Sequence, residues 1–333
     1  MSQSFEEDRP QAAGLLLAAR LSGFTRLEYV SQYAVWFLLM VVILVGAVAS
    51  PHFLTPNNIF NVMRQAAALA FVSLGQTFAI MADCVDISVG SMISLTQCLA
   101  AGTMNGQAAG ILPALGLIAG AVAANGLANG LAVAKRKGNP FIVTLGSMAV
   151  VQGVVLLYTG GSPLGSVPDG VRQLAEGYVG PAPFPVVLVV VLFLLAHVAL
   201  RRTRYGRYVL AVGGNEEIAR LSGIRTARIK VATYLLSSAA AALTGIFLAA
   251  RMNIGDPLVG VGFDLDSIAA VVIGGTDIAG GRGSIVGTMG GVLLYAVLNN
   301  LMNVLNVSPF YQIVAKGAVM VIAISVYQLR YSR

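Results

Sequence analysis

Two short segments combine aspartate with glycine, serine and threonine between long apolar runs. Residues 83–91 read Asp-Cys-Val-Asp-Ile-Ser-Val-Gly-Ser, and residues 274–284 read Gly-Gly-Thr-Asp-Ile-Ala-Gly-Gly-Arg-Gly-Ser. Such breaks are typical of the interrupted helices that line polar cavities in transporters, where water or substrate satisfies the freed backbone groups. Alternatively, both are tight turns at the inner membrane surface, in which Asp86 and Asp277 cap the next helices. The candidate pathway or gate residues here are Asp86, Ser88, Ser91, Thr276 and Asp277.

Uncharged polar residues stand inside several apolar runs, where they are costly in lipid and tend to face a bundle interior or an aqueous path. Amides and hydroxyls suit a neutral polyol better than an ion. The alternative is hydrogen bonding between helices, which we expect to account for at least half of them. The set is Gln65, Gln76, Thr77, Asn125, Asn129, Thr144, Gln152, Asn299, Asn300 and Asn303. Five of these join the candidate pathway: Asn125, Asn129, Thr144, Asn299 and Asn300.

Other kinds of chemistry are not indicated. There is no GxxxxGK[ST] pattern for nucleotide phosphates, and Gly281-Arg282-Gly283 does not match GxGxxG. His52 and His197 have no matched nucleophile, and Cys84 and Cys98 lack the spacing of a metal or redox site. We therefore expect no catalytic residue, no metal site and no directly bound cofactor. Lys316, inside the last apolar run, either extends towards the membrane surface, pairs with Asp264 or Asp266, or contacts substrate.

The composition describes the elements that must position these residues. Hydrophobic residues make up 57% of the 333 and charged residues 11%, against roughly a quarter charged in a soluble chain. The sequence predicts an all-α, polytopic transmembrane helical bundle of about ten spans, at about 20 apolar residues a span. Segments 88–105 and 266–281 are short or glycine-broken, and we consider them candidates for half-helices or re-entrant segments. The predicted spans are 33–50, 59–82, 88–105, 111–134, 140–158, 183–200, 231–250, 266–281, 284–304 and 309–327.

The distribution of lysine and arginine predicts the orientation, because basic loops stay on the cytoplasmic side. With the N-terminus inside, the outer loops keep only Arg172 and Arg251. Both termini are therefore expected in the cytoplasm. The net charge of +7 reflects this topology and not a nucleic-acid surface, since the cations are not interleaved with aromatic residues on one face. The chain divides into a cytoplasmic N-terminal segment (1–32), one transmembrane domain (33–328) and a cytoplasmic tail (329–333).

The inner loop 201–230 is about thirty residues long and carries eight basic residues. Within it, Asn215 is a suitable N-cap, Glu216 and Glu217 occupy a first helical turn, and Gly223 is a suitable stop. The pattern predicts a short helix docked on the cytoplasmic surface. Elsewhere, small residues repeat every four positions in Gly116-Gly120-Ala124 and in Gly283-Gly287-Gly291, which predicts close helix packing.

As an ordered set these motifs resemble the permease subunits of bacterial ABC importers for monosaccharides, the ribose-type family. The resemblance extends from about Asn57 to Tyr327. It rests on Asp86-Ile87-Ser88-Val89-Gly90-Ser91, on Asn139-Pro140-Phe141-Ile142-Val143-Thr144-Leu145, on Gly206-Arg207 with Gly213-Gly214-Asn215 and Ser222-Gly223-Ile224, on Gly274-Gly275-Thr276 with Gly280-Gly281-Arg282-Gly283, and on Tyr311-Gln312 before Lys316.

The resemblance implies a type II-like importer fold in the bacterial inner membrane and transport of a monosaccharide or related polyol by alternating access. It implies three protein partners: a second permease, either another copy or a paralogue, a cytoplasmic ATP-binding subunit that holds ATP and Mg, and a periplasmic sugar-binding protein. The family commonly has Ala-Ala after the asparagine, whereas this chain has Glu217-Ile218. The residues expected to couple to the ATPase are Gly213, Gly214, Asn215, Glu216, Glu217, Ser222, Gly223 and Ile224.

Two other classes of function remain open at this point. An ion-coupled secondary transporter of a small polar solute is favoured by Asp83, Asp86 and Asp277 near broken segments. A membrane-embedded enzyme would need an acid, a base and a nucleophile together inside the membrane, and no such set is evident in the sequence.

Overall fold

The computed structural model describes residues 34–308, 310–315 and 317–318. The predicted N-terminal segment 1–32, Lys316 and the predicted tail 329–333 lie outside the described residues. Within them the fold is helical, apart from a two-residue antiparallel pair, β1 (Tyr178–Val179) and β2 (Ala182–Pro183). The all-α class is confirmed for this part of the chain.

The long helices follow the predicted apolar runs closely. They are an apolar helix Ala34–Ala49, α2 (Pro56–Met81), α3 (Val89–Met104), α4 (Ile111–Arg136), α5 (Pro140–Thr159), α7 (Phe184–Arg202), α10 (Thr226–Met252), α11 (Phe263–Ile273) and α12 (Ile285–Val304). Four shorter helices lie in the connections: the 3-10 turn η1 (Ala108–Gly110), α6 (Asp169–Glu176), α8 (Arg204–Gly214) and α9 (Glu216–Leu221).

The prediction of ten spans is not confirmed within the described residues, and the predicted span 309–327 lies largely outside them. Five helical stretches of the described residues are long and apolar enough to cross a bilayer: Ala108–Arg136, Pro140–Thr159, Phe184–Arg202, Thr226–Met252 and Ile285–Val304. The predicted span 266–281 contains only α11, whose 11 residues extend about 16 Å against a hydrocarbon thickness of about 30 Å. The helix ends because Gly274 and Gly275 follow it, and Gly275 adopts φ +89°.

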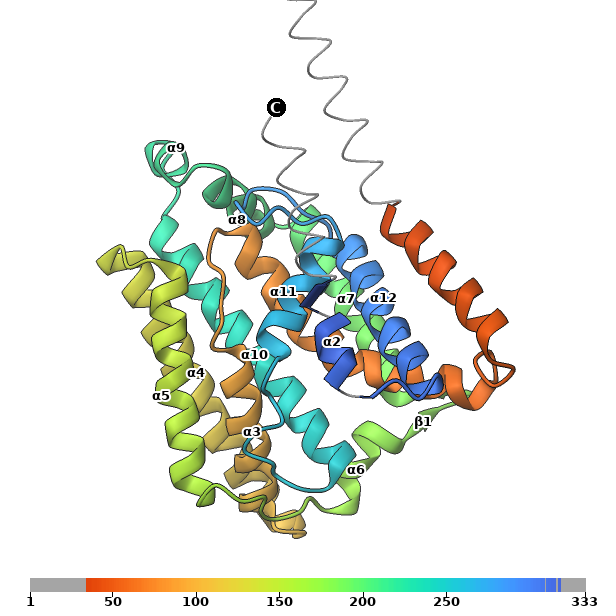
Figure 1. The fold of residues 1–333 in the computed structure, drawn as a ribbon. Helices are drawn as coiled ribbons and strands as arrows, with labels where there is room; N and C mark the ends of the chain where they lie inside the picture. The colour runs from red at the N-terminus through yellow and green to blue at the C-terminus, as the bar shows by residue number, and fades with distance from the viewer. Residues whose placement is uncertain (1–33, 309, 316, 319–333) are drawn as a thin grey trace, which may run out of the picture.

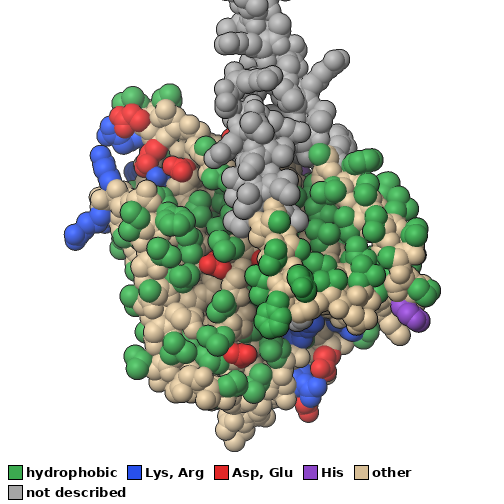
Figure 2. Space-filling model, viewed as in Figure 1, with side chains coloured by type: hydrophobic (Ala, Val, Ile, Leu, Met, Phe, Trp, Pro, Cys, Tyr) green, Lys and Arg blue, Asp and Glu red, His purple; other side chains and the backbone are tan. Residues whose placement is uncertain are grey.

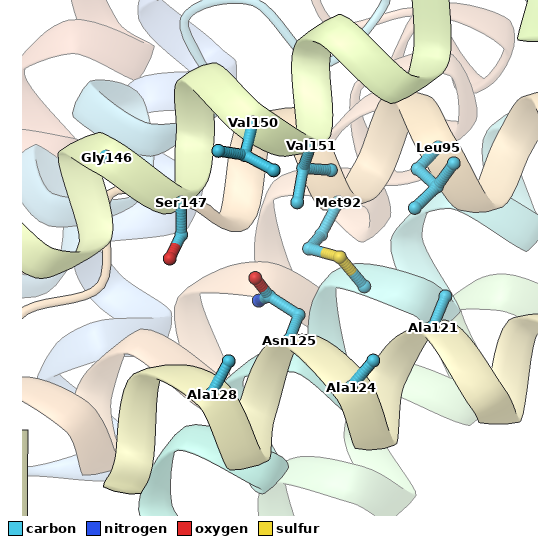
Figure 3. A pocket seen from close by; sticks show the side chains of 10 residues that line it. All are labelled: Met92, Leu95, Ala121, Ala124, Asn125, Ala128, Gly146, Ser147, Val150 and Val151. Atoms are coloured by element: carbon cyan, nitrogen blue, oxygen red, sulfur yellow. The ribbon is translucent and has the colours of Figure 1, made fainter. Parts of the chain in front are cut away.

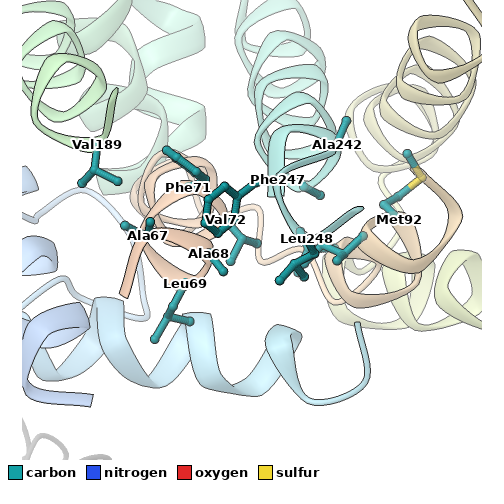
Figure 4. Packing of buried hydrophobic residues seen from close by; sticks show 14 of the residues in the cluster. Ala67, Ala68, Leu69, Phe71, Val72, Met92, Val189, Ala242, Phe247 and Leu248 are labelled. Carbon is teal, nitrogen blue, oxygen red and sulfur yellow. The ribbon is translucent and has the colours of Figure 1, made fainter. Parts of the chain in front are cut away.

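Helix α10 lies at the centre of the bundle, with α2, α3 and α4 packed around it, and α5 lies beside α3 and α4 (Figure 1). Phe71 of α2 meets Phe247 of α10 edge to face with ring centroids 5.6 Å apart, in the middle of the apolar core (Figure 4). Helix 34–49 packs on α12 through a separate cluster that includes Val35 and Leu294. The buried polar residues of interest are therefore held among apolar side chains.

The two small-residue repeats behave differently. A Cβ atom at Gly287 would lie 1.9 Å from the carbonyl oxygen of Gly274, and one at Gly291 would lie 1.9 Å from that of Ala270, so α12 packs backbone to backbone against α11 and the loop that follows it. At Gly116 and Gly120 a Cβ would meet nothing within 4 Å. Close packing is thus confirmed for the second repeat, whereas the first lies on an open face within the described chain.

The outer surface matches a membrane protein. Figure 2 shows apolar side chains spread over the visible sides, with lysine and arginine beside α9 at one end and a second group of them near the opposite end. Large apolar side chains are exposed along α5 and α7, among them Ile142, Leu157 and Leu194. In water this exposure would be unfavourable, so these faces are suited to lipid or to a neighbouring protein.

Candidate functional site

A buried carboxylate organises the loop between α2 and α3. Asp86 is fully buried, and its Oδ1 accepts hydrogen bonds from the Ser88 backbone N–H at 3.0 Å and from Ser88 Oγ at 2.6 Å. From α10, Ser237 Oγ donates to Oδ2 at 2.8 Å. The carboxylate therefore fixes the turn at which α3 begins and ties it to the central helix.

Two asparagines of α4 extend this arrangement. Asn125 and Asn129 are one helical turn apart and so share a face, and each donates its amide Nδ2 to Ser88 Oγ at 3.1 Å. Asn125 also donates to Ser238 Oγ at 3.0 Å, and Ser147 of α5 donates to Asn129 Oδ1. We call this set, made of Asp86, Ser88, Asn125, Asn129, Ser147, Ser237 and Ser238, the Asp86 network.

The structure thus brings together four of the predicted pathway residues: Asp86, Ser88, Asn125 and Asn129. Sequence reasoning missed Ser147, Ser237 and Ser238. The signal was present in Ser237-Ser238, the only pair of adjacent serines in the apolar run 231–250.

A groove of about 500 Å³ opens above this network, between α3, α4 and α5 (Figure 3). Apart from Asn125 and Ser147 its walls are apolar or glycine: Met92, Leu95, Ala121, Ala124, Ala128, Gly146, Val150 and Val151. Its volume lies within the range of small-molecule sites. It is large enough for a monosaccharide.

Asn125 is the polar contact that this groove offers. Its amide nitrogen is engaged by Ser88 and Ser238, while no described residue donates a hydrogen bond to its carbonyl oxygen. In Figure 3 that oxygen points into the space between α4 and α5, towards the side on which Ser147 lies. A free carbonyl in an apolar cleft can accept a hydrogen bond from a hydroxyl group, and the surrounding methyl groups suit the C–H face of a sugar ring.

The other predicted pathway residues make separate contacts. Ser91 Oγ donates to the Ser88 carbonyl at 2.9 Å, and Thr144 Oγ1 donates to that of Pro140 at 2.8 Å. Asn300 forms two reciprocal hydrogen bonds with Asn58 of α2, at 2.9 and 2.8 Å. Asn299 beside it is half-buried. The Asn300–Asn58 pair is a hydrogen-bonded contact between two helices, which was the alternative to a pathway role for polar residues inside spans.

The second broken segment is built differently from the first. Asp277 Oδ1 accepts from the Ala279 N–H at 2.8 Å within its own turn, and Thr276 is fully buried with its hydroxyl unpartnered within the described chain. The cap of α12 is Ser284, which accepts from the Gly287 N–H at 3.2 Å. Asp277 therefore closes a local turn and is not the cap of the next helix.

The short helix predicted in the inner loop is present as α9. Asn215 is its N-cap and accepts from the Ile218 N–H at 3.0 Å. At its other end Gly223 has φ +81°, and the N–H groups of Gly223 and Ile224 bond back to Arg220 and Ala219, which is a Schellman arrangement. Helix α8 before it was not predicted, although its buried Val209 and Val212, three residues apart, carry a helical signal.

One ion pair connects α9 to the bundle. Lys230 Nζ of α10 lies 2.7 Å from Glu216 Oε2. Partial burial raises the pKa of Glu216, but the hydrogen bond and charge of Lys230 outweigh this and hold the pKa below its usual value. Ile218 and Leu221 remain exposed at 62% and 76%. The helix therefore presents an apolar edge outward while its base is anchored by charge. Among the described residues, no group of His, Cys, Asp and Glu is placed to hold a metal ion.

The sequence matches a known protein family over most of its length. The pattern of the family described as branched-chain amino acid transport system / permease component matches residues 58–324. The chain belongs to this permease family. In this family ATP hydrolysis lies in a separate subunit, so the permease is a transport subunit and not an enzyme.

Several curated relatives are similar over nearly the whole permease. The chain is 41% identical to the ribose import permease protein RbsC of Bacillus subtilis (strain 168), over 86% of this chain and 89% of the relative. It is 39% identical to RbsC of Escherichia coli (strain K12), over 91% and 95%. It is 32% identical to the D-allose transport system permease protein AlsC of Escherichia coli (strain K12), over 90% and 92%. No solved structure matches the chain. The resemblance found in the sequence is confirmed.

Proposed function

We propose that the chain is the permease subunit of an ATP-driven importer, and that it carries a monosaccharide or related polyol across the bacterial inner membrane by alternating access. The observation that best supports this proposal is the groove above the Asp86 network, where the neutral amide oxygen of Asn125 faces apolar walls. The relatives, permeases for ribose and D-allose, support a sugar as cargo.

The groove is the part of the pathway that this chain contributes. A sugar hydroxyl donates to Asn125, and the network below holds that amide in place through Ser88 and Ser238. A single hydrogen bond of this kind contributes about 0.5–1.5 kcal/mol. Such a contact is weak, which suits a transport step, since a tight site would slow release.

The partners are proposed from the family and from two surfaces. The exposed Ile218 and Leu221 of α9 suit docking into a cytoplasmic ATP-binding subunit, which binds ATP and Mg. The open face of α4 and α5 suits a second permease, either another copy or a paralogue, and a periplasmic sugar-binding protein delivers the sugar on the opposite side. With both termini cytoplasmic, the chain makes ten crossings of a type II-like importer, in which α11 is a half-helix and the loop 274–284 completes a short, broken crossing.

The rival function is ion-coupled secondary transport, which the buried carboxylate of Asp86 favours. Reconstituted complexes separate the two functions. The permease, its ATP-binding subunit and its binding protein are placed in proteoliposomes, and uptake of radiolabelled ribose is followed with internal or external ATP and with a protonophore.

An ATP-driven importer takes up ribose only when ATP is on the side of the ATP-binding subunit, and it continues when the protonophore collapses the proton gradient. Uptake that needs the gradient and ignores ATP would establish the rival. Galactose and allose, run in parallel with their own binding proteins absent, test whether the permease alone discriminates among sugars.

A further inference from the structure

The C-terminal end of α2 is closed by a loop from a distant part of the sequence. The last four carbonyls of a helix have no partner within it. Here the Ala82 N–H bonds to Phe78 and Ala79, and the Asp83 N–H bonds to Ile80. The remaining carbonyl, that of Met81, accepts from the Gly281 N–H at 2.9 Å. The first broken segment is therefore tied to the second through one backbone hydrogen bond.

Gly213, near the end of α8, lies against this hydrogen bond. A Cβ atom at position 213 would be 1.8 Å from the Met81 oxygen and 2.6 Å from the Gly281 nitrogen, that is, against both of its atoms. Glycine inside a helix is less favourable than alanine by about 0.5–1 kcal/mol, so the close approach is the physical reason for it here. At the neighbouring Gly214, the nearest atom to a Cβ would be 4.0 Å away.

A third contact connects the turn after α2 to α8 and to the loop 274–284. Gly280 has φ +83°, and a Cβ there would lie 2.9 Å from the Gly213 oxygen and 3.1 Å from the Asp83 nitrogen. We call the meeting of Met81, Gly213, Gly280 and Gly281 the glycine junction. It joins α8, the loop after α2 and the loop 274–284 through backbone atoms, without flexible side chains between them.

The junction lies between the two parts of the proposed machine. Asn215, the cap of α9, is two residues after Gly213, and Asp86 is five residues after Met81. Figure 1 shows α8 beside α9 at one end of the bundle. Closely packed groups transmit displacement because they have no void into which to relax. A shift of α9 towards or away from the bundle therefore reaches the start of α3 through this contact.

We propose that the glycine junction transmits the movement of α9 to the Asp86 network, and that Gly213 is a positioning residue that couples ATP hydrolysis to sugar movement. This inference rests on the proposed function, because it requires an ATP-binding subunit that moves α9. It assigns to a backbone contact the step that connects the docking helix to the groove.

Gly213→Ala and Gly170→Ala form the pair of test variants, since each adds one methyl group to a helical glycine, and a Cβ at Gly170 of α6 would meet no described atom within 4 Å. In proteoliposomes containing the complete complex, ATP hydrolysis and uptake of radiolabelled ribose are measured together. We expect Gly170→Ala to behave as wild type. Gly213→Ala should hydrolyse ATP but lose about tenfold in ribose transported per ATP, within the range of coupling changes that such contacts produce. Equal transport per ATP in the two variants would overturn the proposal.

A second readout needs no sugar. Val150 lines the groove and is 68% exposed, and both native cysteines are buried, so Val150→Cys provides one accessible thiol among the described residues. Its labelling by a maleimide is compared with and without ATP and vanadate. The ATP-dependent change in labelling rate should persist with Gly170→Ala and disappear with Gly213→Ala, and a change that persists in both overturns the proposal even if ribose is not the cargo.

Should Gly213→Ala fail to assemble, Gly280→Ala tests the glycine junction from the loop 274–284. A Cβ there would lie 2.9 Å from the Gly213 oxygen. Loss of the ATP-dependent labelling change with hydrolysis retained supports the junction, and its retention contradicts it. If the wild-type complex shows ATP-dependent labelling but no ATP-dependent ribose uptake, ribose as cargo is refuted and the junction is still decided.

Discussion

The two glycine-containing aspartate breaks look alike in the sequence but are stabilised by different means. In the first, Asp86 is the centre of a side-chain network that joins α3, α4, α5 and α10. In the second, Asp277 accepts a hydrogen bond from Ala279 within its own turn, and the loop is fixed by backbone contacts at Gly274, Gly280 and Gly281. The first break therefore depends on its polar side chains. The second depends on glycines, whose lack of a Cβ atom permits close backbone contacts.

The largest expected difference concerns the two aspartates. Asp86→Ala leaves Ser88 and Ser237 without their acceptor, and since hydrogen bonds to a charged group contribute about 1.5–3 kcal/mol each, we expect a large loss of thermal stability and no ribose uptake. Asp277→Ala removes one local hydrogen bond and should cost about 1 kcal/mol. Thermal unfolding in detergent and uptake in proteoliposomes measure both. Equal losses would show that the breaks do not differ.

The backbone contacts are tested by adding a single methyl group. In Gly287→Ala the Cβ would lie 1.9 Å from the Gly274 oxygen, which we expect to destabilise the protein by about 1–3 kcal/mol through overpacking. Gly116→Ala, with nothing within 4 Å, is the control and should be neutral or stabilising by up to about 1 kcal/mol. The shift in unfolding temperature measures each. If Gly116→Ala is instead destabilising, α4 packs against another subunit at Gly116 in the assembled complex.

The groove is tested by comparing Asn125 and Asn300, two asparagines that the sequence placed in the same candidate pathway. Asn125→Leu removes the free carbonyl and fills the groove, so uptake should fall about tenfold, equivalent to 1.4 kcal/mol, with binding of the ATP-binding subunit unchanged. Asn300→Leu breaks only the pair with Asn58, and we expect lower stability with little change in uptake per assembled complex. The opposite result would move the pathway from α4 to α12.

The smallest effect is expected at α9. Glu216→Gln weakens the contact with Lys230, and because the carboxylate is partly exposed the loss should stay below about 1 kcal/mol. The lowered pKa of Glu216 means that this stabilisation is present above its ordinary value of about 4.3 and is lost as the pH falls through the lower folded value. Amide hydrogen exchange of α9 at two pH values measures it. Glu217→Gln, whose partner Arg220 lies on the same helix, should leave the contact between α9 and α10 unchanged.

Much of this molecule could be predicted from local signals. Asn215 and Gly223 determined the bounds of α9 because capping depends on a few neighbouring residues, and the polar residues inside spans led to Asn125 and Asn129. The predicted bounds 266–281 were wrong because apolar composition continues through Ile278, whereas the helix α11 ends before Gly274. The spacing of Gly116 and Gly120 could not reveal that no described residue packs there, since a repeat describes one helix and not what lies opposite.

The contact between Gly213, Met81 and Gly281 consists of main-chain atoms, which every substitution elsewhere leaves chemically the same. If the groove holds the sugar and the glycine junction couples it to ATP hydrolysis, as we propose, side chains that line the groove can diverge to suit a different sugar without altering the junction. Relatives named for ribose, D-allose and galactose are the kind of diversity that such a separation permits.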